Sequence, residues 1–140
     1  MDVTLRFDCS NVDWTVVYET LKRVGMGHFS PGLHQKAFEA SQATVFAYSG
    51  SQLVGFARAL SDGVCQAAIY DVAVVPEFQR HGIGAQLVKA LLSRFSRFNV
   101  ILYSSPGKED FYRKLGMRKM KTGMAQFPDA EARALKGFIE

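Results

Sequence analysis

A strand that is apolar on both faces, followed closely by an amphipathic helix, restricts the fold of this chain more than any other feature. The strand is Ala67–Val75, and Pro76 ends it. The helix is predicted over Gly82–Phe95, and its apolar residues recur at helical spacing, so one side of it must face a core. Another apolar strand, Asn99–Tyr103, follows, so we expect a right-handed crossover between two parallel, buried strands. The inner positions of the helix are Ile83, Leu87, Leu91 and Phe95.

The remaining segments predict a mixed α/β sheet that helices cover on both faces. Glycine-containing turns separate β-rich runs, and helix stop signals follow the periodic segments. The other expected strands are Val3–Phe7, the hairpin Thr44–Tyr48 and Leu53–Ala59, and extended structure from Met117 onward, including Gly123–Phe127. Four other helices are expected. The first starts at a variant capping box, Ser10–Asp13, and ends at Gly25; the second starts near Pro31, the third starts at Ser105–Pro106, and the last follows Pro128.

Length and composition describe one ordinary globular domain over residues 1–140. With 48% apolar and 21% charged residues, the chain is neither disordered nor a coiled coil. No apolar run is long enough for a bilayer and no secretory pattern opens the chain, so we expect a cytoplasmic protein without a membrane partner. The two cysteines, Cys9 and Cys65, have no metal-ligand spacing, and no metal is expected.

The net charge of +4 suits a polyanionic partner, either a nucleic acid or a phosphorylated ligand. The basic residues are scattered, and the densest group lies between Arg113 and Lys121. No nucleic-acid-binding motif accompanies them. A phosphate-rich cofactor explains the surplus equally well, so nucleic acid is not an expected partner.

The turn before the predicted helix has the properties of a phosphate site. The first amides of a helix lack intrahelical partners and carry the positive end of its dipole. Gly82 and Gly84 remove side chains that would keep a bulky anion away, while Arg80 and His81 add donors at the rim. The Lys-Ser/Thr pair of a Walker loop is absent, and Leu87 stands where a dinucleotide fingerprint needs a small residue.

The pattern Gln79-Arg80-His81-Gly82-Ile83-Gly84 resembles the Gln/Arg-x-x-Gly-x-Gly/Ala pyrophosphate motif of the GNAT family of N-acetyltransferases. Downstream, Phe111–Met117 resembles the Phe-Tyr-x-x-Leu-Gly-Phe segment of that family, with Met in place of the last Phe. The resemblance covers Val54–Phe127 and is vague before it. It implies the GNAT fold, which is a central mixed, mostly antiparallel sheet with a splayed parallel strand pair and helices on both faces.

The resemblance also implies how an acetyl-CoA co-substrate is held. Its pantetheine arm would pair with the main chain of the strand before the turn, and its pyrophosphate would lie on the amides of the turn. Ser105 falls where relatives place a side chain against the cofactor, although a helix N-cap is the stronger interpretation of this serine. The implied cofactor-binding residues are Val72, Ala73, Val74, Gln79, Arg80, His81, Gly82, Ile83, Gly84, Ala85 and Ser105.

Two residues are implied in catalysis. Tyr112 matches the general acid that protonates the departing CoA thiolate in relatives. Asp71 is a carboxylate within an apolar strand, where an unpaired charge is costly. It either binds the acceptor ammonium and relays its proton through water, or forms a structural ion pair; the sequence leaves both alternatives open.

The implied reaction is direct transfer of an acetyl group from acetyl-CoA to a primary amine, with a backbone N–H near Val74 facing the developing oxyanion. The acceptor class stays open among small amines (polyamine, arylalkylamine, amino sugar) and protein amines, and a homodimer is an open alternative because relatives often pair. A non-catalytic acyl-CoA sensor is the competing function. In the first half of the chain we expect a surface location for His28, His34 and Glu39 rather than a place in the acceptor site, and a core location for Trp14 and Phe29.

Overall fold

The computed structural model describes residues 2–140, and the chain forms two compact units. The first unit ends at Leu102, and the second is Tyr103–Glu140. A single domain over the whole chain therefore stays a prediction. In the described part of the chain, no helix has the length and apolar character needed to cross a bilayer.

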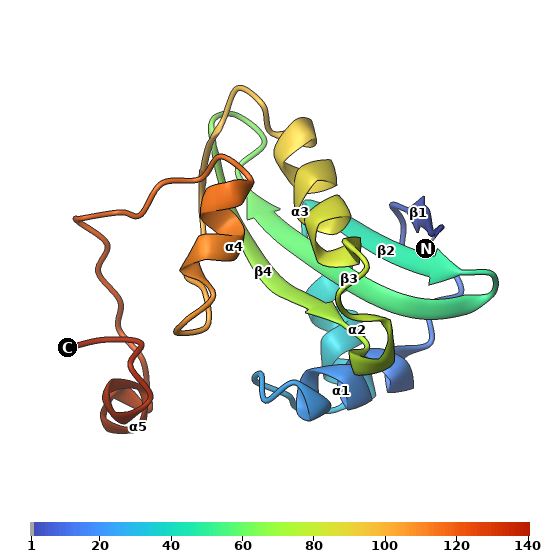
Figure 1. The fold of residues 1–140 in the computed structure, drawn as a ribbon, viewed down its shortest axis with the longest axis horizontal. Coiled ribbons are helices and arrows are strands. Elements are labelled where there is room, and N and C mark those ends of the chain that lie inside the picture. The colour runs from blue at the N-terminus through green and yellow to red at the C-terminus, as the bar shows by residue number, and fades with distance from the viewer. Residues whose placement is uncertain (1) are drawn as a thin grey trace. The chain divides into compact units, whose positions relative to one another are not determined.

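The first unit is built on a five-stranded sheet in the order β1-β2-β3-β4-β5 (Figure 1). The first three pairings are antiparallel, and the β4–β5 pairing is parallel. The prediction of a mixed, mostly antiparallel sheet with one parallel pair is confirmed. The strands are β1 (Thr4–Arg6), β2 (Ala43–Ser49), β3 (Gln52–Ser61), β4 (Gln66–Val74) and β5 (Asn99–Ile101).

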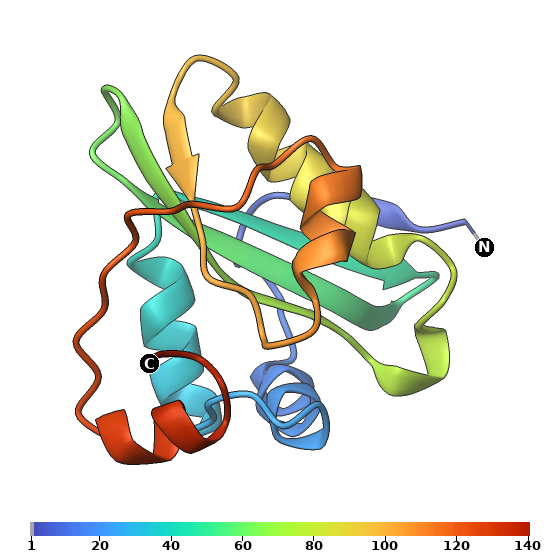
Figure 2. The same ribbon diagram turned by 60° about the vertical axis from the view of Figure 1, so that its left-hand side comes forward.

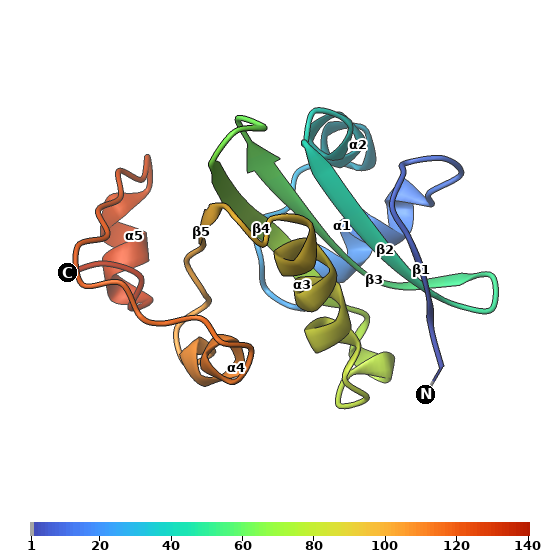
Figure 3. The ribbon, with the colours of Figure 1, turned by 90° about the horizontal axis from the view of Figure 1, so that it is seen from above.

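Helices cover both faces of this sheet. Helices α1 (Trp14–Arg23) and α2 (Pro31–Glu39) lie on one face, and α3 (Ile83–Arg94) lies on the other (Figures 2 and 3). The predicted inner stripe of α3 is buried, with Ile83, Leu87, Leu91 and Phe95 each at most 4% exposed.

Gly55 on β3 allows α3 to pack closely against the sheet. A Cβ built at this position would lie 3.1 Å from Leu87 Cδ1, 3.2 Å from the Ala73 carbonyl oxygen and 3.3 Å from Ile83 Cγ2. Any side chain at position 55 would push the first turns of α3 off the sheet. Gly55 therefore helps to set where the N-terminus of α3 lies relative to β4.

The parallel strands β4 and β5 are paired over a short stretch only. Strands β4 and β5 pair only at Gln66, Ala67 and Ala68 of β4, whereas β4 itself continues to Val74. Among the described residues, no strand pairs with the rest of β4 on the β5 side. The splayed pair that the family resemblance implies is thus present. The edge strand β5 is shorter than predicted, and Ile101 is 48% exposed, so the expectation of a buried strand there was wrong.

The predicted capping box at Ser10–Asp13 is wrong, although the helix and its end are correct. Asp13 is the N-cap of α1, and its carboxylate accepts hydrogen bonds from the amides of Thr15 and Val16. The Ser10 amide instead donates to Asp8 Oδ1 at 2.9 Å. One aspartate that caps two amides of the first turn is sufficient to start the helix at Trp14.

The second unit contains two short helices, α4 (Glu109–Lys114) and α5 (Ala130–Leu135). The Tyr103, Phe127 and Phe138 rings contact one another, and the Arg133 guanidinium lies over both phenylalanine rings, 4.4 and 4.8 Å from their centres. The terminal helix is confirmed. The segment around Gly123–Phe127 forms no strand, so the predicted last strand is absent from the described residues.

Candidate functional site: the β4–α3 turn and the opposite sheet face

The turn between β4 and α3 is held by the protein's own polar groups at its start. Its short helix η1 (Pro76–Phe78) follows the end of the strand directly. Gln79 Nε2 donates a hydrogen bond to the Val74 carbonyl oxygen at 3.1 Å. The Gln79 amide also donates to the Pro76 carbonyl oxygen at 3.2 Å, so this residue fixes the turn to the strand and its backbone offers no free donor to a ligand.

The amides that follow Gln79 have no hydrogen-bond partner among residues 2–140. No described residue accepts a hydrogen bond from the N–H groups of Arg80, His81 or Gly82, and the first intrahelical bond of α3 runs from the Gln86 amide to the Gly82 carbonyl. The N–H groups of Ile83, Gly84 and Ala85 belong to the first turn of α3, where an α-helix provides no acceptor. The turn thus presents a group of donors at the positive end of a helix dipole.

Backbone conformation at this turn needs glycine at one position. Gly82 has φ +77°, in the left-handed region, and a Cβ built there would meet nothing within 4 Å. A side chain at position 82 would project into open space beside the free amides. Arg80 also has a positive φ, +68°, and both Arg80 and His81 are exposed. A diphosphate group needs free donors and open space of this kind, and its binding at this turn stays a prediction.

The open edge of β4 offers further backbone groups. The Val75 amide donates to the Val54 carbonyl oxygen at 2.8 Å, and Val74 is opposite Gly55. Because antiparallel partners alternate between bonded and non-bonded pairs, the main chain of Val74 faces away from β3, and that of Ala73 faces β3. The main-chain groups of Val74, and of Val72 two residues earlier, are therefore better placed than those of Ala73 to pair with an extended ligand.

A β-bulge in β4 lies at Asp71, the one acidic residue of this strand. Arg58 is opposite Tyr70 and Phe56 is opposite Ala73, so the single residue between them on β3 faces two residues of β4. One of these two, Asp71, has φ +57°, a conformation that aspartate tolerates better than most residues. A bulge re-aims side chains and bends the strand. The sequence contained no glycine that would have indicated it.

Asp71 forms an ion pair with Arg58, which is one of the two roles that the sequence left open for this carboxylate. Arg58 Nε donates to Asp71 Oδ2 at 2.7 Å, and the two side chains are only 17% and 22% exposed. The guanidinium also donates to Ser41 Oγ at 3.4 Å and lies over the rings of Phe38 and Tyr70. No residue among 2–140 donates a hydrogen bond to Asp71 Oδ1, so one carboxylate oxygen is open to a ligand.

Two expectations about the α1–α2 loop were wrong. His34 is buried, with 3% exposure, whereas Phe29 is 72% exposed; His28, Glu39 and Trp14 lie as predicted. Helical spacing does not predict this result, because Leu33, the apolar neighbour of His34, points outward at 54% exposure. His34 is buried because its ring has a partner in the loop. The Phe29 amide donates to His34 Nε2 at 3.0 Å.

Burial favours the neutral form of His34. Burial lowers the pKa of this imidazole below the ordinary value of 6.5, and the nearby positive charge of Arg58 adds to the effect, while Asp71 opposes it. Since Nε2 accepts a hydrogen bond from a backbone amide, the proton of the neutral ring is on Nδ1.

Tyr112 and Ser105 lie in the second unit. Tyr112 is on α4, partly buried, with the Phe111 ring edge-on at 4.9 Å. Burial raises the pKa of the Tyr112 phenol above its ordinary value of 10.0, so it stays protonated at neutral pH. Ser105 is exposed and does not cap α4, whose N-cap is Lys108 without a side-chain bond; that interpretation of Ser105 was wrong.

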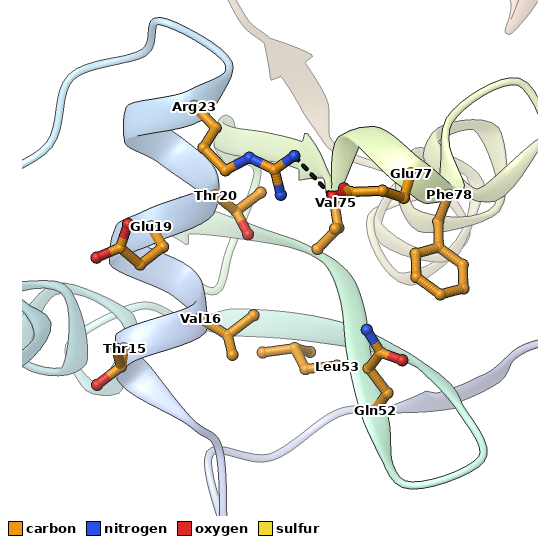
Figure 4. A pocket seen from close by; sticks show the side chains of 10 residues that line it. All are labelled: Thr15, Val16, Glu19, Thr20, Arg23, Gln52, Leu53, Val75, Glu77 and Phe78. Carbon is orange, nitrogen blue, oxygen red and sulfur yellow. Dashed lines mark hydrogen bonds and ion pairs between the residues drawn. The ribbon is translucent and has the colours of Figure 1, made fainter.

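A hollow of about 510 Å³ beside the end of β4 was not predicted. Val16 of α1 and Leu53 of β3 project into it, and Arg23 of α1 pairs with Glu77 of η1 at its rim, at 2.8 Å (Figure 4). The sequence carries no signal for it, because α1, β3 and η1 are brought together only by folding. Its remaining lining residues are Thr15, Glu19, Thr20, Gln52, Val75 and Phe78.

This chain is similar to known proteins in sequence and in fold. The family model described as acetyltransferase (GNAT) domain matches residues 15–126. An uncharacterized N-acetyltransferase ycf52 of Pyropia yezoensis is 31% identical over 119 residues, which cover 83% of this chain and 64% of that protein. Serotonin N-acetyltransferase 2, chloroplastic, of Oryza sativa subsp. japonica is also 31% identical over 119 residues, covering 80% of this chain and 60% of the relative.

Solved structures give the same result for the fold. A GNAT family acetyltransferase from Streptococcus pneumoniae aligns with TM-score 0.76 and 25% identity, covering 91% of this chain and 99% of that one. A GNAT family structure from Xanthomonas campestris pv. campestris aligns with TM-score 0.78 and 21% identity, covering 91% and 94%. This chain belongs to the GNAT acetyltransferase family.

Proposed function

We propose that this protein transfers the acetyl group of acetyl-CoA to a primary amine by direct attack of the amine on the thioester. Membership of the GNAT family supports the reaction class. The chain spans 64%, 45% and 57% of the lengths of three relatives named uncharacterized N-acetyltransferase ycf52, so the activity of the whole protein is part of the proposal.

The observation that carries the proposal is the row of unpartnered amides from Arg80 to Gly82, continued by the first turn of α3. A diphosphate needs several donors that approach from one side, and an N-terminal helix turn supplies them. Gly82 keeps the approach open. We assign the pyrophosphate of acetyl-CoA to this turn, with Arg80 and His81 at its rim.

The strand edge supplies the next contacts. The main chain of Val74 and Val72 faces the open side of β4, and we assign the pantetheine arm to it. The Val74 N–H is then the donor for the oxygen of the thioester carbonyl, where negative charge develops during attack. The β4–α3 turn directly follows the open edge of β4, so one extended ligand reaches both.

Proton transfer is assigned to two side chains. Asp71 Oδ1, the oxygen not bound by Arg58, receives the ammonium of the acceptor and takes up its proton directly or through water. Tyr112 donates its phenolic proton to the departing thiolate, and its raised pKa keeps that proton in place at neutral pH. No cysteine nucleophile takes part.

Names of relatives point to different acceptors. One is called a serotonin N-acetyltransferase and another a histone acetyltransferase, so small amines and protein amines both belong to the proposal. Several plant relatives are named chloroplastic, so the cytoplasmic location that the sequence led us to expect stays a prediction. A homodimer also stays a prediction.

The test is a panel of amines assayed for released CoA, run beside a thermal melt with acetyl-CoA. At about 100 times its Kd, acetyl-CoA should stabilise the protein by about 2.7 kcal/mol, which raises Tm by roughly 10 °C. Release of CoA with at least one amine supports the enzyme. A thermal shift without CoA release from any amine would favour the acyl-CoA sensor, and no shift at all would contradict both.

A further inference from the structure

We propose that Arg58 is the positioning residue for Asp71, and that it holds this carboxylate so that Oδ1 faces the acceptor amine. The inference rests on the proposed acetyltransferase function and adds a residue that acts through Asp71 rather than on the substrate. Its starting point is the ion pair itself, which joins a residue in the left-handed region to an arginine that three other side chains hold in place.

The bulge in β4 brings Asp71 to the same sheet face as Arg58. Residues directly opposite each other in a ladder share a face, so Tyr70 shares the face of Arg58, and in a regular strand the next residue would point to the α3 side. The extra residue of β4 breaks this alternation, and Asp71 takes φ +57° there. Its carboxylate thereby reaches Arg58 Nε at 2.7 Å, on the face where Arg58 lies over the Phe38 ring of α2.

The Arg58 guanidinium is held from several sides. Its central carbon lies 5.8 Å from the ring centre of Phe38 and 5.3 Å from that of Tyr70. Nη1 donates to Ser41 Oγ at 3.4 Å, and that hydroxyl itself donates to the Ala37 carbonyl oxygen at 2.7 Å, which leaves its lone pairs for the guanidinium. Because the side chain of Arg58 is only 17% exposed and its fork is planar, Nε points to β4 in one fixed direction.

A single hydrogen bond from this fixed donor determines which carboxylate oxygen is free. Arg58 Nε donates to Asp71 Oδ2, and no residue among 2–140 donates to Oδ1. The carboxylate cannot rotate without losing its bond to Arg58, so Oδ1 keeps one orientation. A bidentate arginine pair would have occupied both oxygens. The arrangement therefore suits a carboxylate that receives a second cation.

Stability alone does not account for this pair. A partly buried ion pair contributes little net stability, because desolvation of the two charges offsets their attraction. The left-handed conformation of Asp71 costs further free energy, and such conformations gather at functional sites, where the surrounding structure imposes them. Both costs are expected where the position of the carboxylate matters more than the stability it contributes.

The test is a double-mutant cycle on kcat/KM for the amine that releases CoA fastest among 2-phenylethylamine, spermidine, glucosamine and a lysine peptide. Arg58→Gln should lower this kcat/KM roughly 10-fold, because a displaced carboxylate no longer meets the ammonium, while the KM for acetyl-CoA stays constant. Arg58→Lys keeps the charge without the planar fork, so its loss should be smaller, roughly 3-fold. In Asp71→Asn, adding Arg58→Gln should change kcat/KM by less than about 2-fold, since the residue through which Arg58 acts is gone.

Arg113→Gln is the matched control. It breaks another arginine–aspartate pair, at 2.8 Å to Asp110 in the second unit, and it should leave kcat/KM for the amine unchanged. Melting curves of every variant set the assay temperature below the lowest Tm, so that loss of folded protein does not enter kcat/KM. Where Arg58→Gln does not fold, Arg58→Lys alone and in Asp71→Asn gives the same comparison.

Three results would contradict the inference in different ways. A lower Tm with unchanged kcat/KM in the Arg58 variants would make the pair purely structural, and the acetyltransferase assignment would stand. Losses that add in the double variant would show that Arg58 acts independently of Asp71, which also overturns the inference alone. Absence of CoA release from the unaltered protein with every amine would defeat the proposed function and the inference together.

Discussion

The β4–α3 turn and the α1–α2 loop belong to the same unit, yet they are built in opposite ways. The turn works through backbone groups, namely unpartnered amides after Gln79 and a left-handed glycine at position 82. The loop works through side chains, with Phe29 held outward by the buried His34. The comparison teaches that consecutive backbone groups form the turn, whereas a hydrogen bond to a buried side chain fixes the loop.

The largest effect should come from a charge placed in the turn. Gly82→Asp puts a carboxylate beside the free amides, and its repulsion of a diphosphate should cost about 3 kcal/mol, or roughly 100-fold in the Kd for acetyl-CoA. The thermal shift with acetyl-CoA should therefore disappear at moderate concentrations. Gly50→Asp is the matched control, because Gly50 also has a positive φ, +61°, and nothing within 4 Å of its Cβ position. Equal thermal shifts in the two variants would show that the turn is not the binding site.

Tyr112→Phe should reduce turnover without affecting acetyl-CoA binding. Loss of a general acid lowers kcat by roughly 10²- to 10⁴-fold. The thermal shift should stay as in the unaltered protein, because the hydroxyl is assigned no role in binding. Tyr103→Phe, at another tyrosine of the second unit, controls for loss of a phenolic hydroxyl. An unchanged kcat would remove Tyr112 from the mechanism.

Asp71→Asn separates the two roles of the carboxylate. If Oδ1 receives the acceptor ammonium, kcat/KM for the amine should fall about 10- to 100-fold while the KM for acetyl-CoA stays constant. Loss of the partly buried charge pair with Arg58 should also lower the free energy of unfolding by about 1–3 kcal/mol. Asp110→Asn, which breaks the exposed pair with Arg113, should change neither quantity. Loss of stability with normal kcat/KM would make Asp71 purely structural.

The smallest effect is a pH dependence that originates in the loop. The folded-state pKa of His34 is lowered, so below its ordinary pKa of 6.5 the unfolded chain binds a proton more readily than the folded one. Stability should therefore fall as the pH decreases from about 6.5, and it should level off once the pH lies below the folded pKa. In His34→Gln this part of the decline should be absent. Melting curves between pH 4 and pH 8 measure it, with the exposed His28→Gln as control; identical profiles for the unaltered protein and His34→Gln would contradict it.

Much of the fold was predictable, because its signals are local. The hairpin β2–β3, the buried stripe of α3 and the helix at Pro31 follow from turn chemistry and periodicity. The turn at Gly82 was predictable for the same reason, since its glycines and free amides are consecutive in the chain. Nearby capping choices were less certain, and Asp13 rather than Ser10 starts α1 because several polar residues compete for that position.

The side-chain part of the site was not predictable from local pattern. His34 is buried through a hydrogen bond to the loop, and Asp71 enters the left-handed region because β4 has one more residue than β3 at that point. The close approach at Gly55 depends on α3, which comes later in the chain. Each of these features arises from contacts between elements, which hydrophobic spacing does not encode.

The most direct test of the account is an NMR titration of the ¹⁵N-labelled protein with acetyl-CoA. If the turn binds the diphosphate, the amide resonances of Arg80, His81 and Gly82 should shift strongly in a saturable way as new hydrogen bonds form. The Gly50 amide, at the hairpin turn between β2 and β3, should stay in place. Saturable binding that leaves the amides of residues 80–82 unmoved would contradict the account.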